Sequence, residues 1–299
     1  MTSPLLCLLP GAGHLTHGLA SHLGAPLAEV EVRHFPDGET YLRLIADPAG
    51  QDIILVDCLD RPDPKLIPLI FAAMTARDLG AKSVGLIAPY MPYFRQDIEF
   101  RHGESVSARH IGALLSSDFD WVVTLEPHLH RLSAMSDVFT IPGEAARATG
   151  PIADWIAANV EAPMLFGPDA ESEQWVSAIA AACNAPYAVF PKTRLGDRSV
   201  TIDVPPGLDL KGRTPVVVDD ILSSGTTVAT LVKALVAAGG AAPVCIAVHG
   251  LFASGAEDLL KAAGAAQIVT TNAVAHRTNG IDISAPLAEA AKRLLAARH

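Results

Sequence analysis

The sequence predicts an α/β fold with two similar domains, each a mainly parallel β-sheet flanked by helices. Strand-like and helix-like segments alternate along the whole chain, which is the pattern of βαβ units around parallel sheets. With 299 residues, the chain is long for one compact core. A Pro-Gly break at Pro142 and Gly143 separates two halves that repeat the same scheme.

The predicted elements follow one another in the same order in both halves. In the first half we expect strands near residues 4–9, 52–58, 83–88 and 121–125, and helices near 13–23, 63–79 and 105–117. In the second half we expect strands near 163–166, 187–190, 215–218, 244–248 and 267–271, and helices near 150–159, 172–182 and 226–238. The predicted domains are residues 1–142 and 143–284, and residues 285–299 are expected to add a C-terminal helix that packs on the first domain.

Composition and charge narrow the class of protein. No apolar stretch approaches the roughly 18–20 residues of a membrane span, so we expect no membrane partner. The net charge of −10 argues against a broad basic surface for nucleic acid. The four cysteines are widely spaced and form no CxxC pair, which indicates reduced thiols in a cytoplasmic protein. An anionic ligand would therefore need local backbone amides, a metal ion or a few Lys and Arg side chains.

The segment 215–228 carries the most information about function. Three valines predict a buried strand that Asp219 and Asp220 are expected to end, and a small turn then leads into a helix. The turn consists of Ser223, Ser224, Gly225, Thr226 and Thr227. A helix N-terminus with free amides favours a phosphate, and the two carboxylates suit sugar hydroxyls or Mg²⁺. The alternative is an ordinary turn whose polar residues only cap the helix.

Two segments of the first half suggest nucleotide binding. Asp37, Gly38 and Glu39 form a predicted turn beside Phe35, whose ring could stack on a base; the alternative is a plain hairpin turn. The second segment follows the strand near 83–88. It holds Arg95, Gln96 and Asp97, where the arginine could pair with a phosphate. Its alternative is an exposed loop with scattered charges.

Three further segments follow predicted strands. His128 and His130 are two residues apart, which is a weak metal signal by itself. Asp169 is a candidate metal ligand or a complement to a helix N-terminus. Lys192 and Arg194 supply the local positive charge that could stabilise a phosphoryl transition state, or they belong to an ordinary solvated basic loop.

In this order and spacing, these segments resemble the ribose-phosphate diphosphokinase (phosphoribosyl pyrophosphate synthetase) family over nearly the whole chain, and in particular its archaeal-like branch. The resemblance implies two phosphoribosyltransferase-type domains, ATP and ribose 5-phosphate as substrates, Mg²⁺ as cofactor and a homo-oligomer of at least two chains. By resemblance, the ATP-binding residues are Phe35, Asp37, Gly38, Glu39, Arg95, Gln96, Asp97 and His128. By the same resemblance, His128 and Asp169 are metal-associated, Lys192 and Arg194 are catalytic, and Arg194, Asp219, Asp220 and Ser223 to Thr227 bind ribose 5-phosphate.

The chain also departs from the family pattern. Glu126 precedes Pro127 and His128 where many members have Asp-Leu-His, and Ser223 to Thr227 replace the common Asp-Thr-Ala/Gly-Gly-Thr. The expected activity is transfer of the β,γ-diphosphoryl group of ATP to the C1 hydroxyl of ribose 5-phosphate. Two alternatives remain at this point: a phosphoribosyltransferase that uses the same turn, and a non-catalytic paralogue that regulates a partner synthetase.

Overall fold

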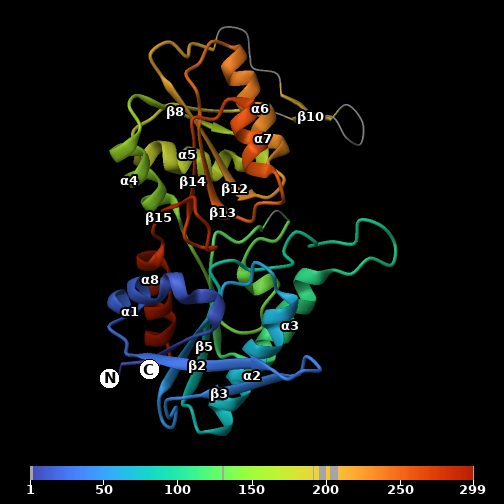
Figure 1. Cartoon of the computed structure of the whole chain (residues 1–299), viewed down its shortest axis with the longest axis vertical. Helices are drawn as coiled ribbons and strands as arrows, with labels where there is room; N and C mark the ends of the chain where they lie inside the picture. The colour runs from blue at the N-terminus through green and yellow to red at the C-terminus, as the bar shows by residue number, and fades with distance from the viewer. Residues whose placement is uncertain (1–2, 130, 191, 195–199, 203–207, 299) are drawn as a thin grey trace. The chain divides into compact units, whose positions relative to one another are not determined.

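The computed structural model describes residues 3–298 apart from 130, 191, 195–199 and 203–207, and for 192–194 and 200–202 it describes the backbone only (Figure 1). The chain forms two compact units. Unit 1 comprises Met1–Arg147 together with Ile283–His299, and unit 2 comprises Ala148–Asp282. Among the described residues, no helix combines the length and the apolar character needed to cross a membrane.

Unit 1 is built on a seven-stranded sheet with the order β3-β2-β1-β4-β5-β6-β7. Its strands are β1 (Leu5–Leu8), β2 (Leu27–His34), β3 (Thr40–Leu44), β4 (Asp52–Val56), β5 (Ser83–Ile87), β6 (Trp121–Leu125) and β7 (Gly143–Ala146). Every neighbouring pair is parallel except β2 and β3, which form an antiparallel hairpin. The three strands β4, β5 and β6 are buried along their whole length, as expected of parallel strands covered on both faces.

The helices of unit 1 come from both ends of the chain. They are α1 (Thr16–Leu23), α2 (Asp63–Asp78), α3 (Ser107–Asp118) and α8 (Ser284–Ala296), with short 3₁₀ turns at Pro10–Leu15 and Met135–Asp137. Helix α8 packs on α1 and along β6 and β7, so helices from the two ends of the chain lie side by side (Figure 1). Arg293 reinforces this packing through an ion pair with Glu144 on β7.

Unit 2 is built on a six-stranded, entirely parallel sheet with the order β15-β14-β13-β12-β8-β9. Its strands are β8 (Pro163–Gly167), β9 (Tyr187–Val189), β12 (Thr214–Leu222), β13 (Val244–Gly250), β14 (Gln267–Thr271) and β15 (Asn279–Ile281). Strands β10 (Lys192–Arg194) and β11 (Val200–Ile202) form a separate antiparallel hairpin. The helices are α4 (Thr149–Asn159), α5 (Glu173–Ala182), α6 (Thr226–Ala237) and α7 (Ala256–Ala263), with a 3₁₀ turn at Ala170–Ser172.

The predicted fold class is confirmed, and most predicted elements lie within a few residues of their expected bounds. Strand β12 is an exception, because Asp219 and Asp220 do not end it. The neighbouring strand β13 continues to pair with β12 as far as Leu222. The expectation was wrong because a long parallel partner supplies hydrogen bonds to polar residues that have little strand preference of their own.

Several elements are absent from the sequence prediction. These are the strands β2, β3, β7, β10, β11 and β15 and the helix α7. The compact units also differ from the predicted domains 1–142 and 143–284. Residues Gly143–Ala146 form β7, whose pairing with β6 keeps them in unit 1. The domain limits inferred from sequence therefore stay a prediction.

Candidate active site

The carboxyl edge of the unit 2 sheet holds the predicted sugar-phosphate segment at a topological switch point. From β8 the chain runs to β9 on one side, and it later returns through β12 on the other side. In open α/β sheets, ligands bind beyond the strand ends at such a point. Asp169 follows β8, while Asp219 and Asp220 lie near the end of β12. The fold therefore gathers these three carboxylates at one edge.

The turn between β12 and α6 has the geometry of an anion site. Gly225 stands at the N-cap of α6 with φ of 73°, a left-handed conformation that suits glycine. The Ser224 and Thr226 hydroxyl oxygens are 3.2 Å apart. The amide of Ala253 donates to the Ser223 carbonyl at 3.0 Å, which links the turn to the segment that follows β13. Because the first amides of a helix have no partner within it, α6 can offer them to a phosphate.

Asp219 and Asp220 are consecutive residues of a regular strand, so their side chains point to opposite faces of the sheet. Both are half-buried. The amide of Asp220 donates to Asp219 Oδ1 at 3.0 Å, and the amide of Ile221 donates to Asp220 Oδ1 at 2.7 Å. These local hydrogen bonds orient the two carboxylates in different directions. Such an arrangement suits hydrogen bonds from separate sugar hydroxyls better than joint coordination of one metal ion.

Asp169 adopts the capping geometry that the sequence left open as an alternative. Its Oδ1 accepts from the amide of Ser172 at 3.1 Å, at the start of the 3₁₀ turn Ala170–Ser172. In the part of the chain that the structure describes, no group of three or more His, Cys, Asp or Glu residues could hold a metal by itself. Mg²⁺ commonly takes one or two carboxylates and completes its shell with water and substrate phosphates. The carboxyl edge of unit 2, with Asp169, Asp219 and Asp220, offers the small number of carboxylates that such a site needs.

The predicted catalytic residues Lys192 and Arg194 lie on β10, which follows β9 at the same carboxyl edge. Their backbone pairs with Ile202 and Val200 of β11. The structure describes no side chain in this hairpin, and residues 195–199 lie outside the described part.

In unit 1, the Phe35 segment forms the hairpin turn between β2 and β3. The amide of Phe35 donates to the Glu39 carbonyl at 2.8 Å, and the Glu39 amide donates to Asp37 Oδ1 at 3.2 Å. Gly38 has φ of 93°, which favours glycine at this position. The Phe35 ring is exposed and meets Tyr41 edge-on. The hairpin alternative is thus correct for the backbone. The Arg33 guanidinium carbon lies 5.2 Å from the centroid of the Phe35 ring, and stacking of this ring on a base stays a prediction.

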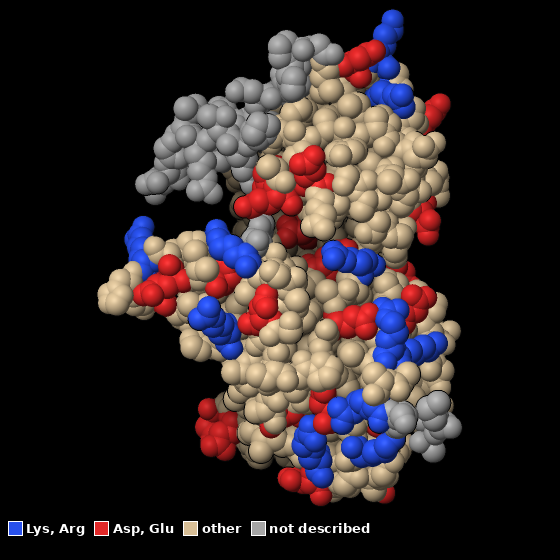
Figure 2. Space-filling model, turned by 180° about the vertical axis from the view of Figure 1, so that it is seen from behind, with Lys and Arg blue, Asp and Glu red and all other residues tan. Residues whose placement is uncertain are grey.

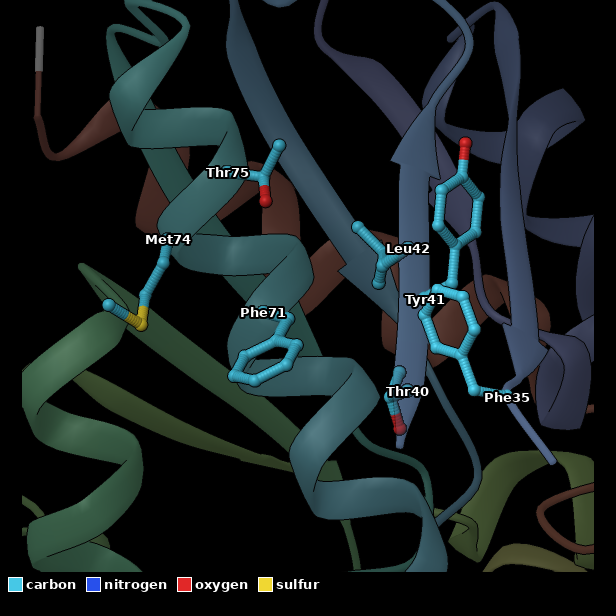
Figure 3. Close-up of a pocket in the computed structure, with 7 residues that line it drawn as sticks. All are labelled: Phe35, Thr40, Tyr41, Leu42, Phe71, Met74 and Thr75. Carbon is cyan, nitrogen blue, oxygen red and sulfur yellow. The ribbon is translucent and has the colours of Figure 1, made fainter. Parts of the chain in front are cut away.

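A groove lies beside this hairpin, between β3 and α2. It has a volume of about 360 Å³ and is lined by Phe35, Thr40, Tyr41, Leu42, Phe71, Met74 and Thr75 (Figure 3). Figure 3 shows Phe71, Met74 and Thr75 projecting from α2, and Thr40, Tyr41 and Leu42 on the neighbouring strand β3. Its lining is mainly aromatic and aliphatic.

The three residues Arg95, Gln96 and Asp97 differ sharply in surroundings. Arg95 is exposed. Gln96 Oε1 accepts from the Ser107 hydroxyl at 3.1 Å and thereby ties the loop to α3. The Asp97 side chain is only 2% exposed, and its Oδ1 accepts from Arg131 Nη1 at 2.9 Å. Arg131 is a functional candidate that the sequence reasoning missed, although it directly follows the His-x-His pair.

His128 lies in the segment after β6, between Glu126 and Arg131. It is half-buried. Glu126 has φ of 36° and forms an ion pair with Arg147 at 3.0 Å. The segments after β5 and β6 are neighbours because these strands pair. The Phe35 turn lies three to four strands away along the same edge, a span of roughly 14–19 Å.

Unit 1 has its own switch point, between β1 and β4, and charged residues of the chain fill it. Asp57 is 2% exposed, and burial raises its pKa from 3.8 to about 7. Lys65 donates to the Cys58 carbonyl at 2.5 Å and pairs with Asp60. A side chain at Gly11 would overlap Asp57 Oδ1, so the backbone lies directly on the buried carboxyl.

Comparison with known proteins places both units in one family. The family model described as the N-terminal domain of ribose phosphate pyrophosphokinase matches residues 6–118, and a phosphoribosyl transferase domain model matches residues 136–283. The chain is 34% identical to ribose-phosphate pyrophosphokinase of Saccharolobus solfataricus, over 88% of this chain and 91% of that protein. It is 32% identical to the protein of the same name from Methanopyrus kandleri, over 92% and 94% of the two chains.

A solved structure agrees in fold. Phosphoribosylpyrophosphate synthetase from Mycobacterium smegmatis has a TM-score of 0.82 and 24% identity, with 99% of this chain and 100% of that chain covered. The resemblance read from the sequence motifs is thus confirmed by similarity that spans both units. The chain belongs to the ribose-phosphate pyrophosphokinase family.

Proposed function

We propose that this chain is a ribose-phosphate diphosphokinase that uses ATP and ribose 5-phosphate. The observation that carries the proposal is the similarity, over about nine-tenths of the chain, to proteins named ribose-phosphate pyrophosphokinase. A phosphoribosyltransferase would leave unexplained the match of residues 6–118 to the N-terminal domain of a pyrophosphokinase. A regulatory paralogue has no specific observation in its favour.

In the proposed reaction, the C1 hydroxyl oxygen of ribose 5-phosphate attacks the β-phosphorus of ATP. The bond from that phosphorus to the α,β-bridging oxygen breaks, AMP leaves, and the hydroxyl proton passes to solvent. The turn from Ser223 to Thr227 holds the 5-phosphate through its amides. Asp219 and Asp220 orient the ribose hydroxyls, which donate to their carboxylates.

Cationic side chains are assigned to the phosphates of the nucleotide and to the group in transfer. Lys192 and Arg194 stabilise the transferring diphosphoryl group, because they follow β9 at the same edge as the sugar-phosphate turn. Arg95 is assigned to the nucleotide side, where its exposed guanidinium can pair with a phosphate. These cations offset the negative charge that builds up when two anionic substrates meet on an acidic protein.

Mg²⁺ belongs to the proposal as the cofactor, and when bound it would offset the negative charge of the substrate phosphates. Asp169 and His128 are the residues we assign to it. The carboxylate of Asp169 suits a hard cation, and His128 is an unusual additional ligand. A metal ion that arrives bound to ATP needs few protein ligands, so a small set of this kind is sufficient.

The proposal is tested by AMP release from ATP in the presence of ribose 5-phosphate, with ribose 1-phosphate and other pentose phosphates as competing acceptors. We expect AMP only with an acceptor that has a free C1 hydroxyl and a 5-phosphate, together with a diphosphate on C1 detected by ³¹P NMR. Consumption of phosphoribosyl pyrophosphate with a base, without ATP-dependent AMP release, would instead identify a phosphoribosyltransferase. An inactive chain that binds an active synthetase would identify a regulatory paralogue.

The proposal includes a homo-oligomer of at least two chains, formed through unit 1. Among the described residues, ten of the twelve exposed large hydrophobic side chains belong to unit 1. Ile67, Phe71 and Met74 of α2 lie at helical spacing along one exposed stripe beside the groove of Figure 3. Light scattering on Phe71→Glu should show a smaller mass than the parent chain. Val236→Glu in unit 2 is the matched control and should leave the mass unchanged.

For the remaining partners and the location, we propose what the sequence predicts, namely no nucleic acid, no membrane and a cytoplasmic location. On the face shown in Figure 2, Lys and Arg are mixed with Asp and Glu and do not gather into one basic surface, which supports small anionic substrates over nucleic acid. The four cysteines all lie in the described part of the chain and form no disulfide, which is in keeping with the proposed cytoplasmic location.

A further inference from the structure

Asp97 lies where a direct contact with a nucleotide is difficult. Its side chain is 2% exposed, one carboxylate oxygen is bonded to Arg131, and the other oxygen is buried without a hydrogen-bond partner among the described residues. Removal of Arg131, the cation that pairs with Asp97 in the described part of the chain, would leave a buried charge uncompensated and strongly destabilise the protein. The buried Asp97 carboxylate therefore fixes the position of the Arg131 guanidinium.

Arg131 has the opposite character, because its side chain is 50% exposed. Its guanidinium lies 5.3 Å from the centroid of the Phe100 ring, so an ion pair and an aromatic face both restrain it. A guanidinium carries five N–H donors in a rigid fork. In the described part of the chain, the only hydrogen bond it makes is the one to Asp97.

In the loop around Phe100, both glutamates accept hydrogen bonds from amides of the same loop. The amides of Phe100 and Arg101 both donate to Glu104 Oε2 at 3.1 Å, and Glu99 accepts from the amide of Gly103. Arg131 is therefore fixed beside a preformed loop, at the edge where Arg95 is also exposed.

We propose that Arg131 is a ligand of the nucleotide phosphates and that Asp97 is a positioning residue that acts through it. This inference rests on the proposed function, since it assigns the nucleotide to the edge after β5 and β6. A pre-oriented guanidinium loses little freedom on binding, and it supplies the local positive charge that a chain of net charge −10 needs for ATP.

The test is a double-mutant cycle of Arg131→Ala and Asp97→Ala, read by calorimetric ATP binding without ribose 5-phosphate and by KM for each substrate. We expect Arg131→Ala to weaken ATP binding about 10- to 100-fold, with KM for ribose 5-phosphate unchanged. Asp97→Ala should have a similar effect, and the double variant should bind ATP no more weakly than Arg131→Ala alone. Arg131→Lys should recover only part of the affinity.

Arg77→Ala is the matched control, because it breaks the Arg77–Asp120 ion pair at the opposite end of β6 and should leave ATP binding unchanged. If Asp97→Ala does not fold, Asp97→Asn takes its place: it removes the carboxylate charge but keeps an oxygen that accepts from Arg131, so ATP binding should lie between that of the parent chain and that of Arg131→Ala. Additive losses in the double variant, or unchanged ATP binding by Arg131→Ala, would overturn the inference. If the parent chain binds ATP but releases no AMP with ribose 5-phosphate, the proposed function fails, while the calorimetry still tests Arg131.

Discussion

The two units share the order of their six parallel strands, to which unit 1 adds the antiparallel strand β3, but they use their switch points differently. In unit 2, the point between β8 and β12 ends in an open turn with a helix N-terminus and with Asp219 and Asp220 beside it. In unit 1, the point between β1 and β4 is occupied by the buried Asp57, with Lys65 against the neighbouring backbone. The chain's own charges thus fill the place in unit 1 that a phosphosugar would take in unit 2.

This difference shows that a fold offers a site without fixing its use. In unit 1 the candidate nucleotide residues lie after β5 and β6 and in the β2–β3 turn, away from the filled switch point. The local side chains decide which strand ends can accept a ligand.

Replacing both Asp219 and Asp220 by Asn should reduce kcat/KM for ribose 5-phosphate by roughly two to four orders of magnitude. Two charged hydrogen-bond acceptors for the ribose hydroxyls are lost, each worth about 1.5–3 kcal/mol. The rate of AMP release against ribose 5-phosphate concentration measures the effect. Asp209→Asn, in an exposed turn of the same unit, is the control and should retain parent activity. A loss of kcat/KM smaller than about fivefold would show that the two aspartates do not bind the ribose hydroxyls.

Lys192→Ala should lower kcat by about two to three orders of magnitude while ATP still binds, because the lost charge acts mainly on the transition state. Turnover at saturating substrates and calorimetric ATP binding measure the two effects separately. Lys211→Ala, another lysine of unit 2, should behave like the parent chain. Near-normal turnover of the Lys192 variant would contradict the catalytic assignment.

Asp57→Asn should leave turnover within about twofold and change the pH dependence of stability. The unfolded chain ionises Asp57 near its ordinary pKa of 3.8, whereas the folded chain keeps the proton until about pH 7. Stability is therefore lost as the pH rises from about 4 to about 7, by up to about 4 kcal/mol, and the neutral Asn avoids this loss. Urea unfolding should show equal stability near pH 4 and a more stable variant at about pH 8. A large loss of activity would show that the unit 1 switch point also binds substrate.

The sequence was sufficient for the fold class, because buried parallel strands such as β4, β5 and β6 are short, mainly apolar runs that alternate with helical segments. It also located the turn after β12, where Ser, Gly and Thr residues directly mark a helix start. It failed at the end of β12, where pairing with β13 overrides the weak strand preference of Asp219 and Asp220.

The pairing of Asp97 with Arg131 could not be predicted, because these residues are far apart in sequence and meet only through the pairing of β5 with β6. The burial of Asp57 is likewise a tertiary property. An acidic residue after a strand looks the same in sequence whether it is buried, as Asp57 after β4 is, or half-buried, as Asp169 after β8 is.

Hydrogen–deuterium exchange with and without ribose 5-phosphate tests the contrast between the two switch points most directly. We predict slower exchange in peptides that cover Ser223 to Thr227, whose amides hold the phosphate, and unchanged exchange in peptides that cover Gly11 and Asp57. Equal protection at both switch points, or protection confined to unit 1, would contradict the account.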